Sequence, residues 1–187
     1  MKYIILSALF LPALIGCKDD PEPAIDLLVN NSMEIGDSSP NSWLDLEQTV
    51  YSTEWTSEEA NSGNKSLKIT ATQTDPTNIA FWAQSFSGSI PVGKDVVLSI
   101  RIKGKNLTGQ GISIAIRGDA ETPRSGLAEQ FGTTEGEIDI TGSFDWTTYN
   151  VRLNGIDSNI KELTVFLIFL PNSTGTVYFD DASLRVQ

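Results

Sequence analysis

The 187-residue sequence contains no histidine. Histidine is the commonest general base and the commonest transition-metal ligand, so its absence excludes a Ser-His-Asp triad and a histidine-based metal site. The single cysteine, Cys17, excludes an intramolecular disulfide and a cysteine zinc cluster. A Gly-x-Ser-x-Gly elbow and a phosphate-binding glycine loop are also missing. We therefore predict that the protein is not an enzyme.

Positive charge is scarce. The sequence has 13 Lys and Arg residues against 24 Asp and Glu residues, for a formal net charge of -11. Such a surface repels phosphate backbones, and we predict no nucleic-acid partner. It can attract divalent cations. Hydrophobic residues make up 40% of the chain, which is typical of a globular fold.

Long hydrophobic runs are absent except at the amino terminus, where Lys2 precedes an apolar run from Ile4 to Leu14. This run is shorter than the roughly 20 apolar residues that a transmembrane helix needs. With a small residue, Gly16, before Cys17, residues 1–16 are typical of a cleaved signal peptide. Residues 14–17, Leu-Ile-Gly-Cys, resemble a bacterial lipobox, which implies that Cys17 is lipidated, as by palmitate.

Residues 17–25 are predicted to be the lipidated cysteine and a tether. Lys18-Asp19-Asp20 resembles the acidic export signal of Bacteroidota surface lipoproteins, and the Pro-Glu-Pro sequence at 21–23 gives a stiff spacer. We therefore expect a protein that is lipid-anchored to the outer membrane and exposed at the cell surface. Its only contact with the membrane would be through the lipid anchor.

Residues 26–187 read as one all-β domain, an antiparallel β-sandwich of the jelly-roll type. Leu98, Ile100 and Ile102 alternate with polar residues, as on a strand with one buried face. Strands are predicted at Ser66–Thr72, Ile79–Phe86, Val96–Lys103, Ile112–Arg117, Trp146–Leu153, Leu163–Leu170 and Thr176–Val186. The least regular segment is Gly118–Glu137, and a loop of this length is more often functional than filler.

Five short motifs carry a resemblance to a known family. They are Leu27–Glu34, Pro40–Trp43, Ser62–Ile69, Phe144–Tyr149 and Val177–Leu184. In this order they resemble galactose-binding-like jelly rolls, the carbohydrate-binding modules that include xylan- and glucan-binding members. Asn31-Ser32-Met33 departs from the small pair and Phe that usually precede the Glu. The resemblance implies a non-catalytic sandwich with one structural calcium ion, and structural roles for Trp43 and Trp146.

The resemblance assigns Glu34 and Asp180 as side-chain ligands of calcium, with backbone oxygens near Asn31 and Lys65. Period-two alternation also places Asp180 on the buried face of Ala182 and Leu184, and a buried carboxylate needs a cation or hydrogen-bond donors. Asp181 would take this place if a bulge shifts the register by one residue. The alternative is that these acids cap turns or pair with Arg and Lys.

Four residues are candidates for ligand binding. Trp82 and Gln84 share one face of a predicted strand, Arg117 lies on the polar face of another, and Phe166 belongs to a run that is apolar on both faces. Sugar rings stack on flat aromatic side chains, while amide and guanidinium groups bond their hydroxyls. The alternative is that Trp82 and Phe166 lie in the core.

One motif points towards catalysis. Residues 136–140, Gly-Glu-Ile-Asp-Ile, resemble the signature of jelly-roll β-glucanases, and alternation would place Glu137 and Asp139 on one strand face. The third acid of that signature is replaced by Thr141 or Gly142. The alternative is an acidic edge strand that leads to Trp146.

The resemblance and the anchor together predict a non-catalytic glycan-binding surface lipoprotein. It would hold a polysaccharide or oligosaccharide at the cell surface, where glycan-processing proteins act on it. One alternative is an adhesion or protein-interaction subunit with no glycan ligand. A more remote alternative is a glycanase that uses Glu137.

Overall fold

The computed structural model describes residues 25–121 and 126–187, and nine strands form the regular structure of this part of the chain. They are β1 (Leu44–Leu46), β2 (Tyr51–Thr56), β3 (Ser66–Ala71), β4 (Ala80–Phe86), β5 (Val96–Asp119), β6 (Gln130–Thr133), β7 (Ile140–Leu153), β8 (Glu162–Phe169) and β9 (Thr174–Val186). The predicted signal peptide and Cys17 lie outside the described residues. Within them, no helix is long and apolar enough to cross a membrane.

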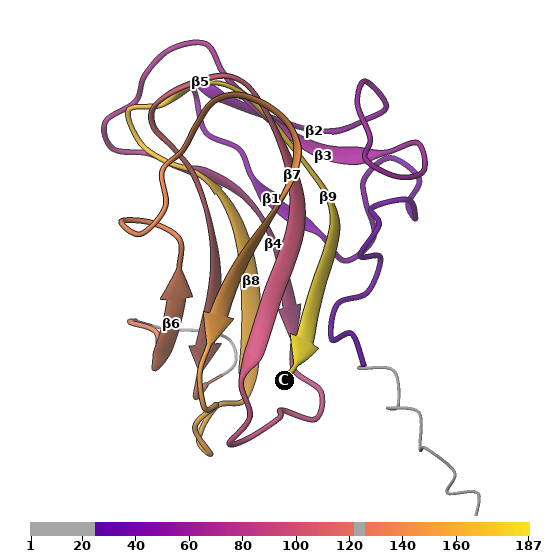
Figure 1. Cartoon of the computed structure of the whole chain (residues 1–187), viewed down its shortest axis with the longest axis vertical. Helices are drawn as coiled ribbons and strands as arrows, with labels where there is room; N and C mark the ends of the chain where they lie inside the picture. The colour runs from indigo at the N-terminus through magenta and orange to yellow at the C-terminus, as the bar shows by residue number, and fades with distance from the viewer. Residues whose placement is uncertain (1–24, 122–125) are drawn as a thin grey trace, which may run out of the picture.

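All paired strands are antiparallel, in the order β1-β4-β8-β5-β9-β3-β2, with β6 and β7 also paired to β5. The first half of β5 pairs with β9 and β7, and its second half pairs with β8 and β6. The strands pack as two layers that share β5 (Figure 1). One layer contains β1, β4, β8 and β6, and the other contains β2, β3, β9 and β7. The prediction of an all-β antiparallel sandwich is confirmed.

Strand β5 joins what the sequence predicted as two strands. Its 24 residues include both Val96–Lys103 and Ile112–Arg117, with register shifts against β7 between them. Gly109 and Gly111 have φ values of +71° and +75°, and a Cβ on either would lie about 2 Å from a backbone oxygen, 1.9 Å and 2.2 Å respectively. Only glycine combines this backbone conformation with such close approach, so β5 can bend from one layer into the other.

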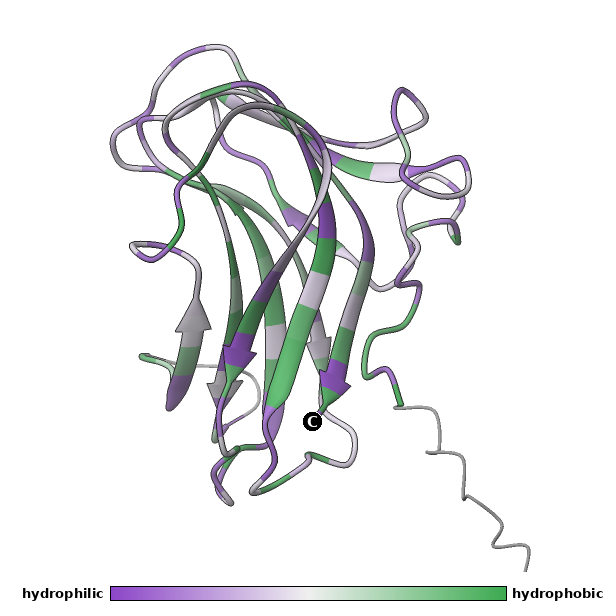
Figure 2. Cartoon of the chain, in the orientation of Figure 1, coloured by the Kyte–Doolittle hydropathy of each residue, from purple (hydrophilic) through white to green (hydrophobic). Residues whose placement is uncertain are grey.

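The core lies between the two layers and follows from strand alternation. Ile100, Ile114, Leu167, Phe169 and Phe179 are all fully buried. Figure 2 shows hydrophobic residues as green bands that interrupt paler residues along the strands. Burial of apolar surface stabilises the fold by about 25 cal/mol per Å², so this interior is the main source of stability in a chain without a disulfide.

The observed strands differ from the predicted ones at some strand ends and in three short strands that were not predicted. β3, β4, β8 and β9 match predicted runs within two residues, whereas β7 begins at Ile140 rather than Trp146. The sequence did not predict β1, β2 or β6, which have three, six and four residues. β6 lies within the segment Gly118–Glu137 that was predicted to be irregular.

Candidate functional site

Trp82 and Gln84 share a face, as predicted, but that face points into the core. Each is 4% exposed. The Trp82 indole donates a hydrogen bond to the Lys68 carbonyl at 3.2 Å, and the Gln84 amide bonds the backbone of Val29. The prediction that these two residues contact a ligand is therefore wrong, because neither side chain reaches the surface.

Phe166 lies on the opposite, outer face of the same layer. It pairs in register with Ala83 of β4 and Ala115 of β5, and its ring is half-buried. The ring of Phe81 meets it edge-on, with centroids 5.3 Å apart and planes at 85°. Phe166 is thus flanked by small alanines on both neighbouring strands, whereas Phe81 pairs with Leu46 and Ile168. Sequence reasoning missed Phe81, because alternation places it on the face opposite Trp82 without showing which of the two faces is the outer one.

Arg117 lies on this outer face next to the aromatic pair. It pairs in register with Thr164 of β8 and Phe131 of β6. Its Nε donates to both carboxylate oxygens of Asp119 at 2.9 Å, and its Nη2 donates to the Gly126 carbonyl at 3.0 Å. Asp119 is 3% exposed, so the pair is fixed and its charges cancel locally. We call Phe81, Phe166, Ile168 and Arg117 the β4–β8–β5 face.

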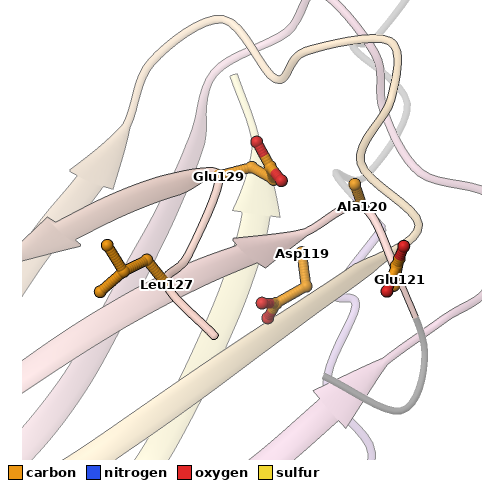
Figure 3. A pocket seen from close by; sticks show the side chains of 5 residues that line it. All are labelled: Asp119, Ala120, Glu121, Leu127 and Glu129. Atoms are coloured by element: carbon orange, nitrogen blue, oxygen red, sulfur yellow. The ribbon is translucent and has the colours of Figure 1, made fainter. Parts of the chain in front are cut away.

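Two shallow cavities lie beside Arg117, at the end of β5. One, of about 420 Å³, is lined by Arg117, Leu127 and Phe131 among others. The other, of about 260 Å³, is bounded by carboxylates at its rim, and Figure 3 shows its lining residues. They are Asp119, Ala120, Glu121, Leu127 and Glu129. Because Asp119 is bonded to Arg117, these acids do not form a metal site, and no group of three or more metal-ligating side chains occurs in the described residues.

Glu34 and Asp180, the predicted calcium ligands, both accept hydrogen bonds from residues 61–65, which we call the 61–65 loop. The Glu34 carboxylate accepts the backbone N–H groups of Asn64 at 2.9 Å and Lys65 at 2.7 Å. Asp180 accepts those of Asn61 at 2.7 Å and Ser62 at 3.0 Å. Both acids are thus bonded to amide donors of one loop.

Asp180 is fully buried, but not on the predicted face. Arg101 pairs with Asp180 and Ser99 with Ser183, so two residues of β9 oppose one of β5. Asp181, with φ +48°, occupies this bulge. Asp180 therefore points away from the core and lies under the 61–65 loop. The prediction that it shares the face of Ala182 and Leu184 is wrong because the bulge inverts the alternation.

The fit to calcium is incomplete. Carboxylates are the ligands that calcium prefers, and burial, with the neighbouring charge of Asp181, raises the pKa of Asp180 to about 6. However, Asp180 also accepts the N–H of Asp181 at 2.7 Å, and the Asn31 carbonyl already accepts the N–H of Ala182. The described hydrogen bonds satisfy these acids without a cation, so calcium stays a prediction.

Glu137 lies in a turn, and Asp139 lies in the irregular segment just before β7, so neither is on a strand. The N–H groups of Glu137 and Ile138 both bond the Thr134 carbonyl, at 3.1 Å and 2.9 Å. A retaining glycanase needs a second carboxylate about 5 Å from the first. The cavity that Glu137 lines contains no second acid among the described residues. The expectation of an edge strand here is wrong, and the geometry gives the glycanase alternative no support.

The other three tryptophans differ in their surroundings. Trp43 is 3% exposed and donates to the Asn30 carbonyl at 3.0 Å, which confirms its structural role. Trp55 donates to the Met33 carbonyl at 2.6 Å, under the ammonium of Lys65 at 4.6 Å. Trp146 is half-exposed on β7, so its structural role is not confirmed.

The outer face of the layer formed by β2, β3, β9 and β7 carries ion pairs. Lys103 and Lys105 both bond Glu59, at 3.1 Å and 2.6 Å, and these bonds lower the pKa of the Glu59 carboxyl. The Tyr178 hydroxyl donates to Glu58 and is 2% exposed. Since the segment that carries Glu58 and Glu59 covers this face, the β4–β8–β5 face is the better candidate for binding.

Comparison with protein-family models and with curated proteins gives no match. Among solved structures, the Stig cyclase FisC from Fischerella sp. TAU, in complex with an indole compound, aligns with a TM-score of 0.62 at 14% identity over 88% of this chain and 98% of that chain. TmCBM61 in complex with β-1,4-galactotriose aligns with a TM-score of 0.54 at 17% identity, over 88% and 100%. The CBM22-1 xylan-binding domain from Paenibacillus barcinonensis Xyn10C gives 0.53 at 15%, over 87% and 95%.

These likenesses define the class of the fold. The described body is a jelly-roll β-sandwich of the kind found in carbohydrate-binding modules, and the same architecture occurs in a cyclase. At these identities the comparison establishes the fold, and any function must be argued from the surface of this chain.

Proposed function

We propose that this protein is a non-catalytic glycan-binding surface lipoprotein, and that the β4–β8–β5 face is its binding surface. The observation that carries the proposal is the Phe81–Phe166 pair, two half-buried rings on an outer sheet face beside Arg117. The same fold occurs in modules whose structures are described as bound to galactotriose or as xylan-binding.

The chemistry of the face suits a sugar chain. Aromatic rings offer apolar surface to the C–H faces of a sugar, and Arg117 offers planar N–H donors to its hydroxyls. Asp119 cancels the charge of Arg117, so the pair favours a neutral ligand over an anion.

Cys17 supplies the anchor in this proposal. The lipobox-like sequence and the acidic residues after it support lipidation and surface display, which would hold bound polysaccharide near glycan-processing proteins at the outer membrane. Incorporation of a palmitate analogue into the wild-type chain, and its loss in Cys17→Ala, would test lipidation. Protease treatment of intact cells would test surface exposure.

The binding test uses the mature chain from residue 17 with Cys17→Ser, screened against plant, algal and host glycans. We expect a glycan to bind, and Phe166→Ala to weaken its binding at least tenfold without lowering the melting temperature by more than a few degrees. Trp146→Ala is the matched control, because this aromatic lies in the other layer. Equal loss in both variants would contradict the assignment of the face.

A second candidate function is protein interaction. Leu127, Leu44 and Phe131 are 93%, 72% and 53% exposed, and Leu127 and Phe131 line one cavity, so part of this apolar surface is contiguous. β1, which carries Leu44, is an edge strand of the layer that forms the β4–β8–β5 face. A folded protein that binds no glycan in the screen would favour this candidate.

We also propose that calcium stabilises the 61–65 loop through Glu34 and Asp180. The support is the approach of both acids to one loop and the raised pKa of Asp180, which a bound cation would lower. A rise in melting temperature with calcium that Glu34→Gln removes is the expected result. An unchanged melting temperature in calcium and in chelator would contradict it.

A further inference from the structure

A groove of about 440 Å³ lies between β6 and β7, and Phe131 lines both this groove and the cavity beside Arg117. Its volume falls within the range of about 300–1,000 Å³ that is usual for small-molecule sites. The side chains that give it chemical character are Phe131, Glu137, Ile138, Asn150, Arg152 and Asn154. We call it the β6–β7 groove.

The fold creates this groove where the two layers meet. β6 pairs with the second half of β5 and the end of β7 with the first half, so they come together as the layers close. At the contact, a Cβ on Gly132 would lie 2.6 Å from the Arg152 carbonyl oxygen. Because Gly132 has no side chain, the backbones of β6 and β7 approach closely at this point. The side chains of the neighbouring residues on both strands line the groove.

One wall is held rigidly. The Gln130 amide donates to the carbonyls of Asn154 and Gly155 at 3.4 Å and 3.2 Å, and its oxygen accepts the Asp157 N–H at 2.9 Å. Asp95 accepts the Gly155 N–H at 2.8 Å. The segment 154–157 is therefore held in place without a ligand, which reduces the conformational entropy lost on binding.

The lining matches a neutral polyhydroxylated ring. Phe131 and Ile138 are 53% and 46% exposed and offer apolar surface. Asn150 and Asn154 carry amides, which both donate and accept hydrogen bonds as hydroxyl groups require. The charge of Arg152 is matched by Asp95, whose carboxylate bonds it at 2.9 Å, so the groove does not select an anion.

Phe131 also connects the groove to the β4–β8–β5 face, because it lines the Arg117 cavity as well. β8 and β6 are the two neighbours of β5 at this point, so they lie two strand spacings apart, roughly 9–10 Å. A chain of several sugar rings could therefore pass from Phe166 over Phe131 into the groove.

We propose that the β6–β7 groove is a further subsite for the same neutral glycan chain, reached across Phe131. This inference rests on the proposed function, and it assigns the groove a specific role: it binds a ring that only longer oligosaccharides supply. Trisaccharides would occupy the face alone.

The test is calorimetric titration of the mature Cys17→Ser chain with trisaccharides and hexasaccharides of β-1,4-galactan, β-1,4-xylan and β-1,4-glucan. For the probe that binds, we expect the hexasaccharide to bind at least tenfold tighter than the trisaccharide. The double variant Asn150→Ala/Asn154→Ala should remove this excess and leave trisaccharide affinity unchanged. Asn159→Ala, an exposed asparagine outside the groove, should change neither affinity.

The outcomes separate the two proposals. If Phe166→Ala weakens both probes while the double variant weakens neither, the groove inference is overturned and the proposed function stands. Equal affinity for both probe lengths also overturns the groove. If no probe binds the wild-type protein, the groove inference fails for these β-1,4-linked chains, whereas the proposed function fails only if the wider glycan screen is also negative. Amide NMR shifts at Thr133 and Glu137 that appear with the hexasaccharide alone would support the groove independently.

Discussion

Gln84 and Val29 are joined by two hydrogen bonds that run in opposite directions. The Gln84 side chain accepts the Val29 N–H at 2.8 Å and donates to the Val29 carbonyl at 2.9 Å. A side-chain amide thus replaces the neighbouring strand that would otherwise pair with this backbone. The interaction fixes the segment before β1 against β4.

We predict that Gln84→Ala destabilises the protein by about 1–3 kcal/mol, because it removes two partly buried hydrogen bonds between the Gln84 amide and the backbone of Val29. Urea denaturation of the purified variant would measure this change. The matched control is Gln73→Ala, which removes an exposed glutamine and should alter the free energy of unfolding by less than about 0.5 kcal/mol. Similar losses in both variants would contradict this role.

Trp82→Ala should lower the free energy of unfolding by about 3–5 kcal/mol, since it empties a large volume of the core. Trp146→Ala, at a half-exposed position, should cost clearly less. Thermal melts of the two variants provide the comparison. If Trp82→Ala melted like wild type, the core assignment of this side chain would be refuted.

Gly63→Ala tests the contact between Glu34 and the 61–65 loop. Gly63 has φ +61°, and an added Cβ would lie 2.4 Å from the Glu34 carboxylate carbon. Gly93→Ala is the control, because Gly93 also has a positive φ (+74°) but no atom within 4 Å of an added Cβ. The control should cost roughly 1–2 kcal/mol from backbone strain alone. The Gly63 variant should cost more, and an equal cost would show that the Glu34 contact contributes nothing.

Because of Asp180, we expect the free energy of unfolding, measured in the presence of chelator, to have an unusual dependence on pH. Burial raises its pKa to about 6, so between pH 3.8 and 6 the folded state retains a proton that the unfolded state releases. Its contribution to stability is therefore fully present below pH 3.8 and is lost as the pH rises through 6.

The measurement is the free energy of unfolding from pH 3.5 to 7 for wild type and Asp180→Asn. Taking the difference removes the opposite contribution of carboxyls such as Asp95 and Asp145, whose pKa values are lowered by hydrogen bonds. We expect the wild-type advantage to shrink as the pH rises. A constant difference would contradict the raised pKa.

The fold was largely predictable because alternation is a local signal. Leu98, Ile100 and Ile102 face the core as expected. The continuity of β5 was not predictable, because Gly109 and Gly111 are typical of a turn, and only contacts with distant backbone show that they lie within a strand. β1 and β6 are too short for alternation to identify.

The candidate site was less predictable, because alternation says which residues share a face and not which way that face points. Trp82 and Phe81 are both aromatic, and only the partner strands decide that Trp82 is inside. At Asp180, one inserted residue in β9 reverses the pattern. Phe131 gave no signal at all, since its segment was expected to be irregular.

The long shared strand also governs when this chain can fold. Every strand that pairs with β5 follows it in the sequence. Likewise, β3 pairs with β9 and β4 with β8, and both partners come late in the chain. A chain that emerges amino terminus first therefore leaves β5, a strand of 24 residues with one apolar face, largely unpaired until β7, β8 and β9 appear. Unpaired strand edges can pair with other chains, so this intermediate is exposed to aggregation, and a product truncated before β8 lacks the strands that complete both layers.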